Sequence, residues 1–128
     1  MSAANTGGSV FSLKTKITTP LFEETKAYYR ALFGLVTIEE WDDGADIGCI
    51  LGFRAEGGEA FLEIYKGDKG DGFKGLSLQF RTADLAAFAA SIRGHHAYEG
   101  PTKRPWGCNY LYLTDPNGIA IVVFEGGN

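Results

Sequence analysis

Residues 104–127, "RPWGCNYLYLTDPNGIAIVVFEGG", decide the fold of this chain. Two runs rich in β-forming residues flank the segment "DPNG". Pro116 favours the first dihedral angles of a turn, and Gly118 suits the left-handed position that closes a three-residue loop with a bulge. The sequence therefore predicts a C-terminal β-hairpin in which Asp115 pairs with Ile119.

The two faces of this hairpin differ in character. From the turn outward, the predicted register opposes Thr114 to Ala120, Tyr112 to Val122 and Tyr110 to Phe124. Because side chains alternate along a strand, one face carries Cys108, Tyr110, Tyr112, Thr114, Ala120, Val122 and Phe124. The other is purely aliphatic, with Leu111, Leu113, Ile119, Ile121 and Val123, and should pack on a helix. The aromatic face should line a groove, if each half of the chain forms a strongly curved sheet.

Upstream of the hairpin, one order of elements occurs twice. The first set is a strand at 10–18, a helix at 21–34 and strands at 35–41, 47–55 and 60–67. The second is a strand at 76–82, a helix at 83–94, an edge-like strand at 95–100 and the hairpin. In the first helix Gly34 occupies a C-cap position, and helical spacing relates Phe22, Ala27, Tyr28, Ala31 and Leu32.

These elements predict two βαβββ modules in a single domain. We assign residues 1–9 to a disordered lead-in, 10–67 to module one, 68–74 to a glycine-rich linker and 75–126 to module two. A gapless alignment of residues 48–67 with 107–126 supports a duplication. It places Cys49 on Cys108, Phe53 on Tyr112 and Glu63 on Val122.

Composition excludes several partners. The chain has 128 residues and a net charge of −4 without a Lys/Arg-rich stripe, so nucleic acid is not expected. Its apolar runs are all shorter than the roughly 20 residues of a membrane span, and the first residues lack the features of a secretory signal. A cytoplasmic location follows by default. The negative charge mildly favours a cationic ligand.

The chain resembles the vicinal oxygen chelate superfamily of glyoxalases, extradiol dioxygenases and bleomycin-resistance proteins. The resemblance rests on the duplicated βαβββ order and on three segments, "KAYYRALFGL" (26–35), "AFLEIY" (60–65) and "PWGCNYLYLTDPNGIAIVVFE" (105–125). It implies an α+β fold in which the modules form an open, strongly curved, eight-stranded, barrel-like sheet around one cavity, with a helix on the outside of each module.

The resemblance also implies four metal-ligand positions. They fall on Lys14, Glu63, Ser77 and Val122, where the family pattern has histidine, glutamine or glutamate. Only Glu63 fits, so we expect neither a metal nor another cofactor. We hypothesise that Lys14 pairs with Glu63 and replaces the metal electrostatically; alternatively, Lys14 extends into solvent.

Histidine and cysteine offer no obvious substitute ligands. On a strand, the adjacent His95 and His96 would point to opposite faces, and an exposed edge is the simpler interpretation. In the aligned register Cys49 and Cys108 both face the cavity, where a redox or soft-metal role is an alternative to a small buried hydrophobe.

The cavity faces carry many aromatic side chains and a few polar ones, which is typical of small-molecule sites. Beyond Leu51, Gln79, Cys108, Val122 and a rim tryptophan, Trp41, we predict these ligand-binding residues: Lys14, Phe53, Phe61, Glu63, Tyr65, Ser77, Arg81, Trp106, Tyr110, Tyr112 and Phe124. Alternatively, these rings fill a closed core.

Two functions remain open, beside a domain without a small ligand. The first, by resemblance to the metal-free bleomycin-resistance proteins, is a homodimeric protein that binds and sequesters an aromatic small molecule. The second is an enzyme of the superfamily, a lyase or dioxygenase, metal-free or with an atypical metal site. In a metal-free enzyme Glu63 is a weak candidate base, and Tyr112 or Arg81 would hold an anion.

Overall fold

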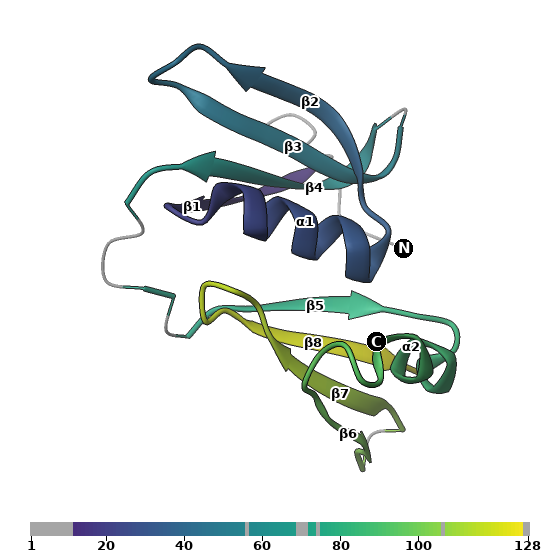
Figure 1. Cartoon of the computed structure of the whole chain (residues 1–128). Helices are drawn as coiled ribbons and strands as arrows, with labels where there is room; N and C mark the ends of the chain where they lie inside the picture. Colours follow the sequence, from purple (N-terminus) through teal and green to yellow (C-terminus); the bar gives the residue numbers. More distant parts are fainter. Residues whose placement is uncertain (1–11, 56, 69–71, 74, 106, 127–128) are drawn as a thin grey trace. The chain divides into compact units, whose positions relative to one another are not determined.

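A computed structural model describes residues 12–55, 57–68, 72–73, 75–105 and 107–126 of the chain (Figure 1). The chain divides into two compact units, Met1–Lys69 and Gly70–Asn128, which correspond to the predicted modules and are described separately. The predicted lead-in and most of the predicted linker lie outside the described residues. The predicted single-domain organisation stays a prediction.

Module one is a βαβββ unit with a mixed four-stranded sheet. Its elements are β1 (Leu13–Thr19), α1 (Phe22–Phe33), β2 (Val36–Asp42), β3 (Ile47–Arg54) and β4 (Gly57–Lys66). The strand order is β1-β4-β3-β2; β1 runs parallel to β4, and the other pairs are antiparallel. The helix therefore serves as the crossover between the parallel strands.

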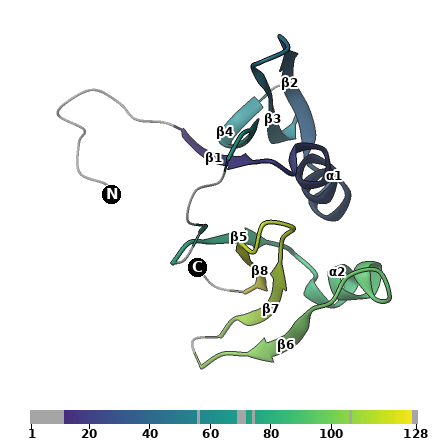
Figure 2. The same cartoon turned by 60° about the vertical axis from the view of Figure 1, so that its left-hand side comes forward.

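Module two repeats this arrangement. Its elements are β5 (Ser77–Arg81), α2 (Leu85–Ile92), β6 (Glu99–Lys103), β7 (Asn109–Thr114) and β8 (Ala120–Glu125), with the strand order β5-β8-β7-β6. Each module carries its helix against one face of its own curved sheet (Figures 1 and 2). The α+β class and the two predicted βαβββ modules are confirmed.

The C-terminal hairpin has the predicted register. Tyr112 pairs with Val122, and Thr114 pairs with Ala120. Gly118 has a φ of 84°, in the left-handed region that its position in the turn requires. The aliphatic face is the core of the module: Leu111, Leu113, Ile119, Ile121 and Val123 are all buried. The turn residues and the alternating pattern thus predict the same register, and the structure has it.

Asp115 holds the turn from within. Its backbone N–H donates to the carbonyl oxygen of Ile119 over 3.0 Å. Its Oδ1 atom accepts the backbone N–H groups of Asn117 at 2.7 Å and of Ile119 at 2.9 Å. Asp115 is only 4 % exposed, so few waters could replace this acceptor.

The predicted helix is present as α1. Gly34 ends the helix with a φ of 67°, and its N–H donates to the carbonyl oxygen of Arg30. The buried residues are Phe22, Thr25 and Tyr29, whereas Ala27 and Ala31, which helical spacing relates to Phe22, are exposed. Both sets satisfy helical spacing; the aromatic ring of Tyr29 buries more apolar area than alanine, which favours the observed face.

The strand predicted at 95–100 begins later. The backbone N–H groups of His95 and His96 both donate to the carbonyl oxygen of Ile92, so the histidines continue the turn that ends α2. The strand β6 starts at Glu99, which pairs with Tyr112, and contains Pro101. Proline is tolerated there because β6 is an edge strand.

The gapless alignment of the modules places β3 wrongly. Ile50 pairs with Glu63, and Tyr112 pairs with Val122, so the equivalent of Tyr112 is Ile50 and not Phe53. A register shift between Gly52 and Arg54 accompanies the different hairpin of module one. An alignment without gaps cannot represent such a shift.

Among the described residues, no helix is long and apolar enough to cross a membrane.

Candidate functional site

The sheet of module one has one face toward α1 and one face without a helix of its module, which we call open face one. Strand register and alternation assign its residues, because paired residues point the same way. They are Lys14, Lys16 and Thr18 on β1, Phe61, Glu63 and Tyr65 on β4, Gly48, Ile50 and Gly52 on β3, and Glu39 and Trp41 on β2. Buried Ile17, Cys49, Leu51, Leu62 and Ile64 lie on the opposite face.

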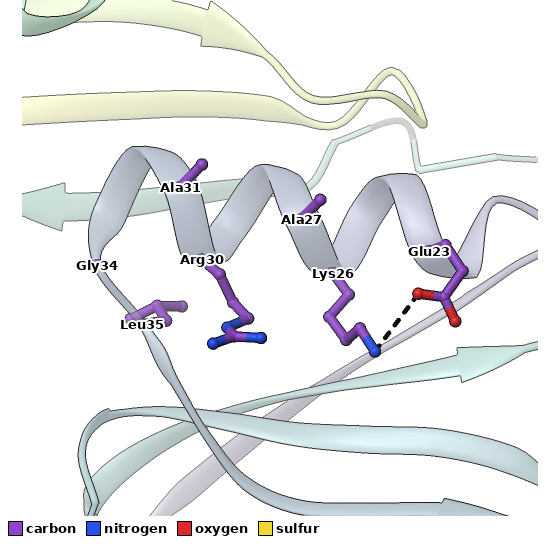
Figure 3. Close-up of a pocket in the computed structure, with 7 residues that line it drawn as sticks. All are labelled: Glu23, Lys26, Ala27, Arg30, Ala31, Gly34 and Leu35. Atoms are coloured by element: carbon purple, nitrogen blue, oxygen red, sulfur yellow. Dashed lines mark ion pairs between the residues drawn. The ribbon is translucent and has the colours of Figure 1, made fainter.

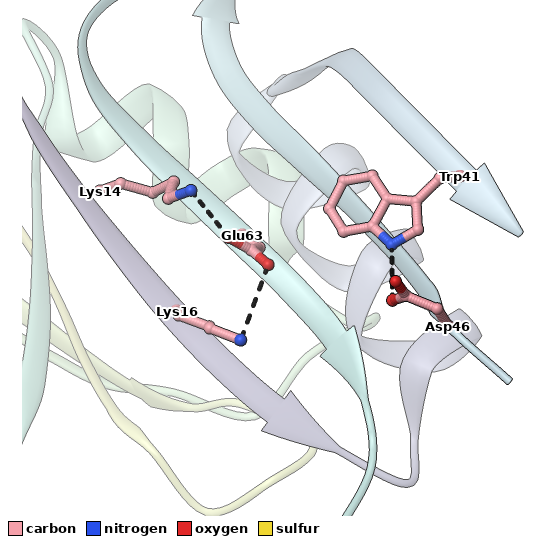
Figure 4. Close-up of polar contacts among 5 residues, drawn as sticks. All are labelled: Lys14, Lys16, Trp41, Asp46 and Glu63. Carbon is pink, nitrogen blue, oxygen red and sulfur yellow. Dashed lines mark hydrogen bonds and ion pairs between the residues drawn. The ribbon is translucent and has the colours of Figure 1, made fainter. Parts of the chain in front are cut away.

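The predicted pair between Lys14 and Glu63 is present on open face one (Figure 4). The Lys14 ammonium lies 2.9 Å from Glu63 Oε1, and the Lys16 ammonium lies 3.9 Å from Oε2. The Glu63 side chain is 10 % exposed, while the two lysines are 47 % and 50 % exposed. Lysine nitrogens from β1 thus neutralise a largely buried carboxylate on β4.

These residues do not fit the divalent metal of the superfamily. Lys14 places an ammonium beside Glu63, where a second metal ligand would be required. Ser77 and Val122, at the positions implied in module two, offer a hydroxyl group and no donor atom, respectively. Within the described parts of the chain, no three His, Cys, Asp or Glu residues are grouped as a metal site. The donor set falls short of the three protein ligands that a catalytic zinc usually has.

Trp41, Asp46 and Tyr65 form a second polar contact group on this face. Trp41 Nε1 donates to Asp46 Oδ1 over 3.0 Å (Figure 4). The pKa of Tyr65 is raised, chiefly because its hydroxyl group donates a hydrogen bond to Asp46. The ammonium of Lys16 lies 4.5 Å from the centroid of the Tyr65 ring. Sequence reasoning identified Tyr65 and placed Trp41 at the rim, but missed Lys16 and Asp46.

A glycine gives Trp41 its position. A Cβ atom at Gly48, which pairs with Trp41 across the strands, would lie 2.4 Å from the indole ring. Only glycine therefore lets the ring lie flat on β3. A tryptophan opposite a glycine on neighbouring strands was a signal that the sequence offered.

The sheet of module two has a corresponding open face two, and here the predicted assignment holds. Strand pairing places these residues on it: Ser77, Gln79, Arg81, Tyr110, Tyr112, Thr114, Ala120, Val122 and Phe124. α2 contacts β7 and β8, and its buried residues Leu85, Ala89 and Ile92 belong to the core with the aliphatic face.

On open face two, a pair of aromatic rings lies between two arginines. The Cζ atom of Arg81 lies 5.5 Å from the ring centroid of Phe124. The ring centroids of Phe124 and Tyr110 are 6.0 Å apart, and the Cζ atom of Arg104 lies 5.8 Å from the ring centroid of Tyr110. We call these four residues the arginine–aromatic ladder. Arg104 also lies 5.6 Å from the Tyr112 ring and donates from Nη2 to the Tyr112 hydroxyl oxygen.

Arg104 is a site residue that sequence reasoning missed. It follows β6, outside any strand, so the alternation of side chains gives no information about where it points. Its backbone N–H donates to the carbonyl oxygen of Cys108 over 2.7 Å, and its own carbonyl oxygen accepts from Gly107 over 3.0 Å. These two bonds hold the backbone of Arg104, from which the side chain extends.

Four other predicted residues have different outcomes. Leu51 was predicted on the cavity face but is fully buried on the helix side, because the pairing of β3 differs from that in the gapless alignment. Phe53 lies within the register shift between Gly52 and Arg54 and is 59 % exposed, and Phe61 is half-buried on open face one. Trp106 lies outside the described residues. The ligand-binding roles of Phe53, Phe61 and Trp106 stay predictions.

The cysteines are buried thiols. Cys49 was predicted to face the cavity; it is fully buried and pairs with Ile64 on the helix side. Burial raises the pKa of its thiol to about 11, so the nucleophilic thiolate is scarce at neutral pH. Cys108 is also fully buried. Burial favours the interpretation of both as small hydrophobes.

A surface pocket of about 360 Å³ lies along α1 (Figure 3). Its lining residues are Glu23, Lys26, Ala27, Arg30, Ala31, Gly34 and Leu35. The Lys26 Nζ atom lies 2.5 Å from Glu40 Oε2 and 3.4 Å from Glu23 Oε1. The pKa of Lys26 is raised, chiefly by the hydrogen bond to Glu40. The charge of Lys26 is thus already balanced by its neighbours.

Comparison with solved structures shows the fold. An antibiotic-binding protein, TnmS3, from Streptomyces sp. CB03234 is 21 % identical with a TM-score of 0.71, over 96 % of this chain and 100 % of that one. A lactoylglutathione lyase from Agrobacterium tumefaciens is 18 % identical with a TM-score of 0.69, over 94 % and 96 %. A bleomycin-binding protein complexed with bleomycin is 22 % identical with a TM-score of 0.65, over 91 % and 98 %.

No curated protein matches the chain significantly. The family model described as "Glyoxalase/Bleomycin resistance protein/Dioxygenase superfamily" matches residues 13–123, from β1 into β8. This match covers most of both modules. The chain belongs to the glyoxalase/bleomycin resistance protein/dioxygenase superfamily.

Proposed function

We propose that this chain is a binding protein that holds and sequesters an aromatic small molecule without a metal ion. The observation that carries the proposal is the arginine–aromatic ladder, which presents the rings of Phe124 and Tyr110 on the side of the sheet opposite the aliphatic core. Aromatic side chains bind flat ligands with a large contact area and little loss of side-chain entropy.

Two further observations support binding without a metal. On open face one, Lys14 and Glu63 lie at positions where the family resemblance implies metal ligands. The Glu63 carboxylate is instead balanced by the ammonium groups of Lys14 and Lys16. Two of the structural neighbours are an antibiotic-binding protein and a bleomycin-binding protein. Their fold therefore accommodates small-molecule binding, and we extend that role to this chain.

The alternative of an enzyme gains no specific support. Glu63 was the candidate base, but Lys14 contacts one carboxylate oxygen and Lys16 lies near the other. A general base needs a free oxygen within hydrogen-bond reach of the proton that it removes. We therefore retain the binding role alone.

Tyr110→Ala is expected to weaken the binding of a neutral aromatic probe, 2-naphthamide, about tenfold, because the variant loses the central ring of the ladder. Isothermal titration calorimetry measures the dissociation constants. Tyr98→Ala, a tyrosine outside the strands, is the matched control and should bind like the parent chain. Equal affinity in all three proteins, or no binding by the parent chain, would contradict the proposed function.

We also expect a homodimer, from the resemblance to the bleomycin-resistance proteins, and a cytoplasmic location by default. The strands β2 and β6 are edge strands of their sheets, and an edge presents unpaired backbone groups to a second copy.

A further inference from the structure

We propose that open face two selects an anionic aromatic ligand, an aromatic carboxylate, and that Arg104 binds its oxyanion; this inference rests on the proposed function. The overall charge of −4 favours the opposite, a cationic ligand. The charges next to the aromatic rings, however, act over a shorter distance than the net charge and decide which ligand the rings accept.

Within the described part of the chain, Arg104 is a cation without a counter-ion. None of the described carboxylates lies within ion-pair distance of it, including Glu99, which pairs with Tyr112 on the same face. Its Nε atom is buried without a hydrogen-bond partner. A guanidinium group has five N–H donors, and the described contacts engage one, on the Tyr112 hydroxyl. A partly desolvated charge of this kind gains most from an anionic partner.

The surroundings of Arg104 match the rest of such a ligand. Its guanidinium group lies beside the rings of Tyr110 and Tyr112, so an oxyanion bound to it would hold an attached ring against Tyr110. Beyond Tyr110 the ladder continues through Phe124 to Arg81. A planar oxyanion suits arginine better than lysine because the guanidinium fork can donate two parallel hydrogen bonds.

The loop geometry preorganises this contact. The backbone of Arg104 is tied to Cys108 and Gly107, and the Tyr112 hydroxyl group holds the far end of the side chain. Little side-chain entropy then remains to be lost when the ligand binds.

The test compares three naphthalene probes that differ in charge: 2-naphthoate, 2-naphthamide and 2-naphthylmethylammonium. Calorimetric titration of the parent chain should give the tightest binding for 2-naphthoate, about tenfold tighter than for 2-naphthamide, because hydrogen bonds to charged groups are the stronger ones. The cationic probe should bind most weakly. Added sodium chloride should weaken the binding of 2-naphthoate and leave that of 2-naphthamide nearly unchanged.

Arg104→Met is expected to weaken 2-naphthoate about tenfold and to change 2-naphthamide no more than about twofold. Arg93→Met is the matched control, since Arg93 is exposed at the end of α2, and should bind both probes like the parent chain. Far-ultraviolet circular dichroism verifies that each variant is folded. The salt dependence of the parent chain tests the proposal even if Arg104→Met does not fold.

The outcomes separate this inference from the proposed function. Equal affinities for 2-naphthoate and 2-naphthamide, or an equal loss in Arg93→Met and Arg104→Met, would overturn the anion selectivity while leaving the aromatic site. If none of the three probes binds to the parent chain, both the aromatic site and its selectivity are refuted.

Discussion

Asp115→Ala is expected to lower the free energy of unfolding by about 3 kcal/mol, because it removes the acceptor of two buried backbone N–H groups, each of which costs roughly 1–3 kcal/mol when left unpaired. The groups belong to Asn117 and Ile119, at 2.7 and 2.9 Å from Asp115 Oδ1. Ile119 is fully buried, so water cannot readily replace the lost acceptor. Urea denaturation followed by circular dichroism measures the change.

Two variants define the specificity of this effect. Asp115→Asn keeps one carbonyl oxygen and should lose less stability than Asp115→Ala. Asp84→Ala removes an exposed N-cap of α2, whose Oδ1 atom accepts from Ala87 over 3.0 Å, and should cost about 1 kcal/mol. If Asp115→Ala costs no more than Asp84→Ala, the hairpin turn does not depend on the buried aspartate.

The double variant Lys14→Met, Lys16→Met is expected to lose about 2 kcal/mol of stability at neutral pH, because it leaves the Glu63 carboxylate largely buried without a cation. Removal of one partner from a fully buried pair costs about 3–5 kcal/mol, and the half-exposed lysines here reduce that value. The two ammonium groups lie 2.9 and 3.9 Å from the carboxylate oxygens. Urea denaturation again measures the difference.

A matched double variant controls for the loss of two charges. Lys66→Met, Lys103→Met neutralises two exposed lysines that make no described ion pair, and it should leave stability nearly unchanged. Glu63→Gln added to the first variant should recover part of the loss, because it removes the buried charge. Equal stability of the two double variants would mean that Lys14 and Lys16 only extend into solvent.

The C-terminal hairpin could be predicted because two independent signals agree. The "DPNG" turn fixes which residues face each other, and the alternation of aliphatic and aromatic residues fixes which face is buried. A slip by one residue would expose Leu111 and bury Tyr110 on the helix side. The observed pairing of Tyr110 with Phe124 follows from that constraint.

The side of β3 that belongs to open face one could not be predicted from the same logic. Its sequence is apolar on both faces, so alternation does not distinguish them, and the register came from the second module. The shift between Gly52 and Arg54 breaks that correspondence and turns Cys49 and Leu51 toward the helix side. A bulge is set by backbone pairing, which leaves little trace in a single sequence.

The candidate site was predictable where it lies on strands and not where it lies on loops. Tyr110 and Phe124 were placed on one face because a strand position implies a side-chain direction, whereas Lys14 and Glu63 came from the ligand positions that the family resemblance implies. Arg104 and Asp46 lie beyond strand ends, and their contacts depend on how the loops fold back. Lys16 shares its face with Lys14 but was overlooked, because only one position per strand was considered as a ligand.

We propose that the Lys14–Glu63 pair stands where relatives in the superfamily would bind a metal. Native mass spectrometry of the purified chain, before and after incubation with zinc, nickel, manganese and ferrous iron, tests this proposal. We expect a dimer whose mass does not change with any of the four metals. One tightly bound metal ion per chain would contradict it.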